Sequence, residues 1–423
     1  MESDHLPESK KDPYIALKYL EFRAFIGMRF FLTFGYQIQA VIIGWYIYHL
    51  TKDPLSLGLI GLAEAIPSIG IALYGGYVAD KSDKKALLKW VLSAMFACSG
   101  ILLLITTPSV SANLGQKNIV LIIYMAIFCT GIARGFLAPT VFSLMAQIIP
   151  KEHYPNSSTW NSTSWMVASI IGPAIGGFVY AYAGVTVTFT LILVFIILSI
   201  ISLLFIKSRP PQFIPKESIM KSLAEGIRFV FNSRMLVGAL SLDLFSVFFG
   251  GAVALIPVIA SEVLHVGAEQ FGMMRAAPAI GAVLTMLLMA RHPPMNKPWR
   301  NLLFAVTGFG ISIICYGLST NFYLTLFVLF FEGAFDSVSV IIRSTIVQLL
   351  TPDEMRGRVS AVNSMFIGSS NEIGAFESGL TARLMGTVPA VVFGGTMTLV
   401  VVSLTYLKTK RLVPLNLKQI NPH

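Results

Sequence analysis

Apolar residues run along this chain in long segments that polar or basic turns separate. A helix needs about 20 consecutive, mostly apolar residues to cross the hydrocarbon core of a bilayer. Twelve segments satisfy this length, so the pattern predicts an all-α integral membrane protein with twelve transmembrane helices. Their approximate limits are 25–49, 55–79, 86–106, 118–146, 159–182, 186–206, 236–260, 270–290, 300–318, 322–348, 361–384 and 388–407.

The longest polar interval divides the twelve segments into two sets of six. It covers 207–235 and contains Lys207, Arg209 and the pair Pro210-Pro211. The sequence therefore predicts an N-terminal six-helix bundle over 1–206, a cytoplasmic linker over 207–235 and a C-terminal six-helix bundle over 236–423.

Two short patterns recur at matching places in the two halves. The first is G-x5-P-x2-G, in the second and eighth segments: Gly61, Pro67 and Gly70, then Gly272, Pro278 and Gly281. The second surrounds the fifth and eleventh segments: Gln147, Asn161 and Gly172, then Gln348, Asn363 and Gly374. Together they predict two pseudo-symmetric repeats. Repeats of this kind are typical of transporters, whose substrate site lies between the halves.

Composition supports the membrane interpretation. Hydrophobic residues make up 55% of the 423 residues and charged residues 12%, with a mean hydropathy of +0.73. Soluble domains carry about 25% charged residues, so soluble enzymes, nucleic-acid binders and disordered chains are excluded. The three cysteines and six histidines show no metal-ligand spacing, and we expect neither a metal nor a cofactor.

The net charge of +10 has a positional meaning. Of the 31 Lys and Arg residues, 24 fall in the two termini and in loops on the same side of the predicted membrane. The opposite loops hold only Lys52 and Lys117. Basic loops stay in the cytoplasm, so both termini are predicted to be cytoplasmic.

The loop after the second segment carries a recognisable motif. The run from Gly76 through Asp80 to Lys84 and Lys85 resembles the G-x-x-x-D-[RK]-x-G-[RK]-[RK] gating loop of the major facilitator superfamily, with Asp83 in place of the usual glycine. The resemblance implies that Gly76 allows close helix packing and that Asp80 faces a helix N-terminus. Both lysines would hold the loop at the anionic membrane surface. Alternatively, this is an ordinary basic loop that fixes topology.

The fifth segment contains a glycine-proline motif. Gly172, Pro173, Gly176 and Gly177 follow Ala168 and resemble the G-x-x-x-G-P-x-x-G-G motif of drug-proton antiporters, with alanine replacing the first glycine. The resemblance implies export, whereas the alternative is generic packing of small residues.

Four further stretches are similar to the facilitator branch of the enterobactin exporter and the macrolide efflux pumps. They are 221–229, 242–245, 351–363 and 371–379. The resemblance implies the major facilitator fold and a secondary active transporter of the bacterial inner membrane. It would export a siderophore or an amphipathic drug, with multidrug resistance as one outcome, by proton antiport and alternating access. We expect a monomer that is not an enzyme and whose partners are substrate, protons and lipid. The alternatives are a lysophospholipid or metabolite transporter, or a transporter-like sensor that moves nothing.

Charged residues inside the membrane cost about 2.5–3.5 kcal/mol each and mark functional sites. Eleven lie in the predicted spans: Glu64, Asp243, Glu332, Asp336, Glu372, Glu377, Arg29, Arg134, Arg275, Arg343 and Arg383. Six acids against five bases indicate internal pairing.

The spacing of these charges selects candidates for coupling and binding. Glu332, Asp336 and Arg343 are four and seven residues apart and therefore share one helix face. In facilitators the first, fourth, seventh and tenth helices line the cavity. We therefore expect Asp336, Glu332 and Asp243 to couple protons or bind substrate, and we add Glu64 and Glu377 from the second and eleventh segments. We expect five further residues to line the cavity: Arg29, Tyr36, Gln37, Arg134 and Arg343. The alternative is a static network of salt bridges.

Two pairs of charges invite more specific predictions. Glu64 and Arg275 occupy equivalent positions in the repeats, each three residues after its glycine, so we expect an ion pair or coupling site between the halves. Glu372 and Glu377 are about 140° apart around one helix and cannot share a face. We expect Glu377 to reach the cavity.

Overall fold

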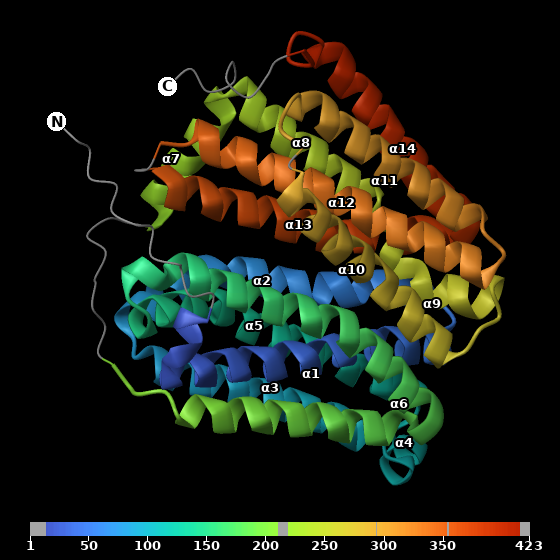
Figure 1. Ribbon diagram of the computed structural model, residues 1–423. Coiled ribbons are helices and arrows are strands. Elements are labelled where there is room, and N and C mark those ends of the chain that lie inside the picture. Colours follow the sequence, from blue (N-terminus) through green and yellow to red (C-terminus); the bar gives the residue numbers. More distant parts are fainter. Residues whose placement is uncertain (1–13, 210–218, 293, 353–354, 415–423) are drawn as a thin grey trace.

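The computed structural model describes residues 14–209, 219–292, 294–352 and 355–414, and these are helical almost throughout. Figure 1 shows two bundles side by side, one formed by α1–α6 and the other by α7–α14.

In the described residues, the N-terminal half contains six helices and two short 3-10 turns, Ile15–Lys18 and Lys151–His153. The six are α1 (Leu20–Thr51), α2 (Leu55–Lys81), α3 (Lys84–Thr106), α4 (Pro108–Leu114), α5 (Gln116–Ile148) and α6 (Tyr154–Leu204).

The described part of the C-terminal half contains eight helices and two irregular turns, η3 (Gly251–Leu255) and the π-helix η4 (Ile259–Val263). The eight are α7 (Ile219–Asn232), α8 (Arg234–Phe249), α9 (Ile256–Val258), α10 (Ala268–Arg291), α11 (Pro298–Leu318), α12 (Phe322–Leu350), α13 (Arg356–Met385) and α14 (Thr387–Thr409).

Eleven of the twelve predicted spans correspond to α-helical segments, and the seventh, 236–260, is divided into α8, η3, α9 and the start of η4. Within the described residues, nine helical stretches are long and apolar enough to cross a membrane. One of them, α6, holds two predicted spans, because it breaks at Gly184, where φ is +80°. Only glycine adopts that φ readily. The remaining two spans are α2, whose apolar part is Leu55–Ile71, and α13.

The structure also contains helices that the apolar pattern does not reveal. The short helix α4 follows α3, and the amphipathic helix α7 lies inside the interval 207–235 that we predicted as a linker. Glu225 of α7 accepts a hydrogen bond of 2.5 Å from Arg358 of α13. Two of the stretches that resemble the exporter branch therefore pack against each other.

Both sequence repeats correspond to equivalent helix contacts. Gly131 of α5 lies against Pro67 of α2, since an added Cβ would be 2.8 Å from the proline ring. Gly333 of α12 lies against the backbone of Pro278 of α10. In the second repeat, Gly172 packs α6 on α1 and Gly374 packs α13 on α8. The two bundles are thus built by the same helix contacts.

The two halves meet mainly through α2 with α13 and α6 with α10. Small residues allow this approach. A Cβ added to Gly58 would be 2.9 Å from Cα of Phe376, and one added to Gly177 would be 2.8 Å from Cα of Gly272. These contacts lie toward the end of the molecule where α1 leads into α2, which we call the joined end.

Side chains reinforce the joined end. The Tyr48 hydroxyl donates to Glu262. Three further contacts join the halves there: Asp53 with Arg383 at 3.4 Å, Tyr182 with Glu269 at 3.0 Å, and Trp45 stacked on Phe271. The described side-chain contacts between the halves thus gather at this end.

We expect Gly281→Ala to destabilise the protein and its repeat counterpart Gly70→Ala to leave stability unchanged. A Cβ at Gly281 would lie 1.9 Å from the carbonyl oxygen of Phe330, whereas one at Gly70 meets nothing within 4 Å. Overpacking costs roughly 1–3 kcal/mol. Thermal unfolding of the two purified variants measures the difference. Equal melting midpoints would show that the α10–α12 contact does not require glycine.

Candidate functional site

A central cavity of about 360 Å³ lies between the two halves. Four carboxylates line it: Glu64 from α2, Glu332 and Asp336 from α12, and Glu372 from α13. Arg275 of α10 and Tyr36 of α1 line it as well. Because both bundles contribute, the cavity is where a bound molecule would contact both halves.

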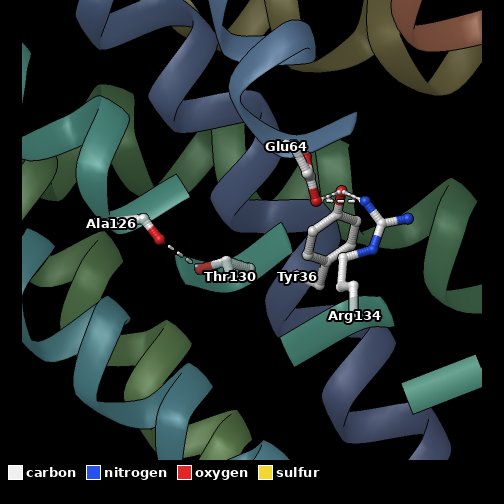
Figure 2. A network of polar contacts seen from close by, with 5 residues as sticks. All are labelled: Tyr36, Glu64, Ala126, Thr130 and Arg134. Carbon is white, nitrogen blue, oxygen red and sulfur yellow. Dashed lines mark hydrogen bonds and ion pairs between the residues drawn. The ribbon is translucent and has the colours of Figure 1, made fainter. Parts of the chain in front are cut away.

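Glu64 belongs to a network within the N-terminal half. The Tyr36 hydroxyl donates to Oε1 of Glu64 at 2.9 Å and accepts from Nη1 of Arg134 at 2.8 Å. The same Nη1 forms an ion pair with Glu64, as Figure 2 shows. The Arg134 guanidinium also lies 4.7 Å from the centre of the Tyr36 ring. Three helices, α1, α2 and α5, thus converge on one carboxylate.

The predicted ion pair between Glu64 and Arg275 is wrong. Both side chains line the central cavity, but Glu64 is held by Arg134 from its own bundle. Arg275 instead donates to the carbonyl oxygen of Val253 at 3.4 Å. Among the described residues, no carboxylate lies within the 4 Å ion-pair distance of Arg275.

Only two of the three charges on α12 face the central cavity. Glu332 and Asp336 line it, whereas Arg343 forms an ion pair with Asp243 of α8. The Arg343 and Asp243 side chains are only 3% and 9% exposed. Neither lines the central cavity, so our prediction that Arg343 lines it is wrong. This contact corresponds to the static salt bridge that we considered as the alternative.

Glu332 carries a fully buried oxygen without a hydrogen-bond partner among the described residues. This oxygen is Oε2, and the side chain as a whole is buried as well. Buried polar oxygens in native structures are usually paired. An unpartnered carboxylate oxygen at a cavity is therefore a candidate for binding a proton or a substrate donor.

On α13, Glu372 lines the central cavity and Glu377 does not, contrary to our expectation. The five-residue spacing places the two on different faces, as predicted, but α13 turns the Glu372 face toward α2. There a Cβ added to Gly61 would lie 3.2 Å from Oε2 of Glu372. The rotation of α13 is set by close packing of α2 on α13, which sequence spacing alone does not give.

A second cavity of about 400 Å³ lies within the N-terminal half, and we call it the basic cavity. Arg29 and Arg134 line it, together with Tyr36, which is shared with the central cavity. Asn161 also lines it and accepts a hydrogen bond from Nε of Arg29 at 3.4 Å. Asn161 was visible in the sequence only as a member of the second repeat, and we did not predict its place in a cavity.

Gln37 lines neither cavity, although we expected it in one. Its Nε2 donates to Ser169 of α6 at 2.9 Å, because Gln37 lies where Gly172 lets α6 approach α1. The next position that faces the centre is Gln39, which lines the central cavity and accepts from Ser99 at 2.6 Å.

The loop after α2 differs in detail from the prediction. A Cβ at Gly76 would meet nothing within 4 Å, whereas one at Gly75 would lie 2.6 Å from the carbonyl oxygen of Gly135, so Gly75 makes the close approach. Asp83, which replaces the usual glycine, caps α3 by accepting from two backbone N–H groups. The side chain of Asp80 lies outside the described residues.

The two lysines of this loop also differ from each other. Lys84 is buried and donates to the carbonyl oxygen of Ser82. We had expected it to lie at the membrane surface, and the burial of its side chain contradicts that prediction. Lys85 donates to the carbonyl oxygen of Leu204 at 3.0 Å and links the loop to the end of α6.

The glycine-proline motif of α6 forms two packing surfaces. Gly172 and Gly176 pack on α1, at Gln37 and Ile38. Gly177 packs on Gly272 of α10, where the carbonyl oxygen of Pro173 also approaches. The motif therefore joins the two halves, which fits generic packing and the antiporter resemblance alike.

Comparison with known proteins extends this description. A family model described as transmembrane secretion effector matches residues 13–421. Similar curated proteins include the enterobactin exporters of Shigella flexneri, at 26% identity, and of Citrobacter koseri, at 25%. Each alignment covers 88% of this chain and 88% of the relative.

Solved structures with similar folds include several transporters. A POT family transporter bound to a thioalcohol-conjugated peptide has a TM-score of 0.72 at 12% identity, over 92% of this chain and 96% of its own. A bacterial homologue of the human lysosomal transporter Spinster, inward-facing and unoccupied, has a TM-score of 0.68 at 14% identity, over 96% and 98%. At these identities the likeness concerns the fold alone, and it confirms the predicted twelve-helix major facilitator architecture.

We expect Arg343→Met to destabilise the protein, because it leaves Asp243 buried without its cation. Removing one partner of a buried ion pair costs about 3–5 kcal/mol, whereas replacing both with apolar residues is often neutral. The double variant Asp243→Leu/Arg343→Met should therefore recover most of the loss. Thermal unfolding of both purified variants measures this, and a double variant as unstable as the single one would contradict the prediction.

Proposed function

This chain belongs to the transmembrane secretion effector family of the major facilitator superfamily, and we propose that it exports a small organic molecule by proton antiport and alternating access. The family and its relatives are transporters, so the protein is a membrane-embedded transporter of a small molecule and not an enzyme. The observation that carries the antiport proposal is the set of four carboxylates in the central cavity.

Carboxylates that share a small cavity repel one another, and the repulsion is strong where water is scarce. A proton relieves it, and so does a cationic or hydrogen-bond-donating group of a substrate. Glu332, Asp336 and Glu372 line the cavity and form no ion pair with a described residue. Protons and substrate thus compete for the same oxygens. Such negative linkage is what exchange requires, because the substrate enters as protons leave.

The joined end supports alternating access. The halves contact each other through glycine-rich helix pairs and a few side-chain contacts at that end. Rocking of two rigid bundles about a central site is how transporters of this architecture work. If the basic loops are cytoplasmic, as we propose, the joined end lies on the outer side of the membrane. Halves that are in contact on the outer side correspond to the inward-facing state. We further propose a monomer in the bacterial inner membrane with both termini in the cytoplasm.

For the substrate we propose a siderophore of the enterobactin kind, with an amphipathic drug as the second candidate. Two relatives that each cover 88% of the chain are named enterobactin exporters. Hydrogen-bond donors on a substrate suit the central cavity, because its carboxylate oxygens accept hydrogen bonds.

We expect Asp336→Asn and Glu332→Gln to lower proton-driven transport of enterobactin roughly tenfold or more, since each removes an exchangeable proton site. Uptake into inverted proteoliposomes under an imposed pH gradient measures the rate, and internal pH reports the proton flux. Glu377→Gln, outside the cavity, is the matched control and should transport normally. Unchanged pH-dependent transport by Asp336→Asn would contradict its role in coupling.

The same variants test export in the cell. A strain lacking this protein and grown under iron limitation should retain siderophore inside and release less into the medium, because the exit path is missing. Metabolite profiling of cells and medium measures both. Glu377→Gln should restore release and Asp336→Asn should not. Normal release without the protein would overturn the siderophore proposal. The absence of proton flux with every siderophore and drug would favour a sensor.

A further inference from the structure

The basic cavity is not needed by the antiport argument, which uses the central cavity alone. We propose that the basic cavity is a separate subsite for an anionic aromatic group, and that filling it transfers Arg134 from Glu64 to the anion. The inference rests on the proposed function only in taking the two cavities as parts of one substrate path.

The described lining of the basic cavity contains two arginines and no acid. Its walls come from α1, α2, α3, α5 and α6, so it belongs to one half. Phe142 and Trp165 line it and are 73% and 51% exposed, leaving aromatic surface open for contact. At about 400 Å³ it lies within the range of small-molecule sites. The lining therefore suits a flat group that carries negative charge.

The guanidinium of Arg29 has hydrogen-bond donors that the described contacts do not use. A guanidinium offers five N–H donors, and the described contacts of Arg29 use one of them, toward Asn161 at 3.4 Å. Among the described residues no carboxylate lies within 4 Å of it. A cation in a membrane span is costly unless it is compensated. Planar anions compensate it best, because they accept two parallel hydrogen bonds from the guanidinium fork.

Arg134 connects the two cavities. It lines the basic cavity, while its partner Glu64 lines the central one and Tyr36 lines both. The Arg134 side chain is 33% exposed and that of Glu64 only 12%, so the guanidinium is the accessible member of the pair. An anion between Arg29 and Arg134 competes with Glu64 for this guanidinium.

Loss of Arg134 changes the surroundings of Glu64. Glu64 keeps the hydrogen bond from the Tyr36 hydroxyl, and the other charged groups that line the central cavity are Arg275, Glu332, Asp336 and Glu372. Three of these four are carboxylates, so a freed Glu64 takes up a proton from solution onto its own oxygen. No other bond forms or breaks. The anion and this proton therefore bind together, a linkage opposite in sign to the competition in the central cavity.

Salicylate tests the subsite, with salicylamide as a neutral control of nearly the same shape. Titration calorimetry on the purified full-length protein should show salicylate binding roughly tenfold to a hundredfold more tightly, the value of hydrogen bonds to a charged group. Arg29→Gln should abolish the preference. Arg383→Gln, at the joined end, should retain it. Equal binding of the two probes, or a preference that survives Arg29→Gln, would overturn the subsite.

Proton uptake tests the transfer of Arg134. In weakly buffered solution, salicylate binding should withdraw protons from the medium, measured with a pH indicator dye. Glu64→Gln should bind salicylate at least as tightly, because a neutral amide competes less well than a carboxylate for Arg134, and should take up no proton. Glu377→Gln should behave like the unmodified protein. Binding without uptake, or uptake that persists in Glu64→Gln, would overturn the linkage.

These results are separable from the antiport proposal. Linked uptake together with an absence of substrate-driven proton flux in proteoliposomes would support the anion subsite and overturn antiport. Flux without linked uptake would support antiport and overturn the exchange at Arg134.

Discussion

A charge inside a membrane needs a partner or water, and this constraint organises the interior of the protein. Where the partner is another helix of the same bundle, the charge becomes structural, as for Asp243 with Arg343. Where no oppositely charged side chain of the described residues lies within ion-pair distance, the charge faces a cavity, as for Glu332 and Arg275. Glu64 and Arg134 lie between these cases, because they pair with each other and also line two different cavities.

Close helix packing decides which of these outcomes a given charge meets. Gly61 brings α2 against α13, where Glu372 faces the central cavity. Gly172 brings α6 against α1, where the Gln37 side chain donates a hydrogen bond to Ser169 of α6. Gly61 on α13 and Gly177 on Gly272 of α10 join the two bundles through glycine-lined surfaces, which are suited to separation as rigid bodies.

The two cavities differ in the sign of their charge. The central cavity has an excess of carboxylates and faces both bundles, whereas the basic cavity lies within one bundle and carries arginines. Tyr36 stands between them with one hydroxyl that contacts both Glu64 and Arg134. In a low-dielectric interior such a contact transmits the binding of charge on one side to the other. In our proposal, the binding of substrate and of protons is coupled through the direct contact of Glu64, Tyr36 and Arg134, and no longer pathway is required.

The sequence by itself determined the twelve apolar spans, the two repeats, the family and the inventory of intramembrane charges, since hydropathy and motifs are local properties of the chain. It did not determine which charges meet. Glu64 pairs with Arg134 and not with Arg275, Glu372 replaces Glu377 at the cavity, and Gly75 replaces Gly76 at the close contact. Each of these outcomes depends on how far a helix is rotated and how closely it is packed. Neighbouring positions of a helix point about 100° apart, so a rotation of that size changes which side chain faces lipid, another helix or a cavity. The local sequence pattern is the same in either case, and only the tertiary structure decides which side chains meet.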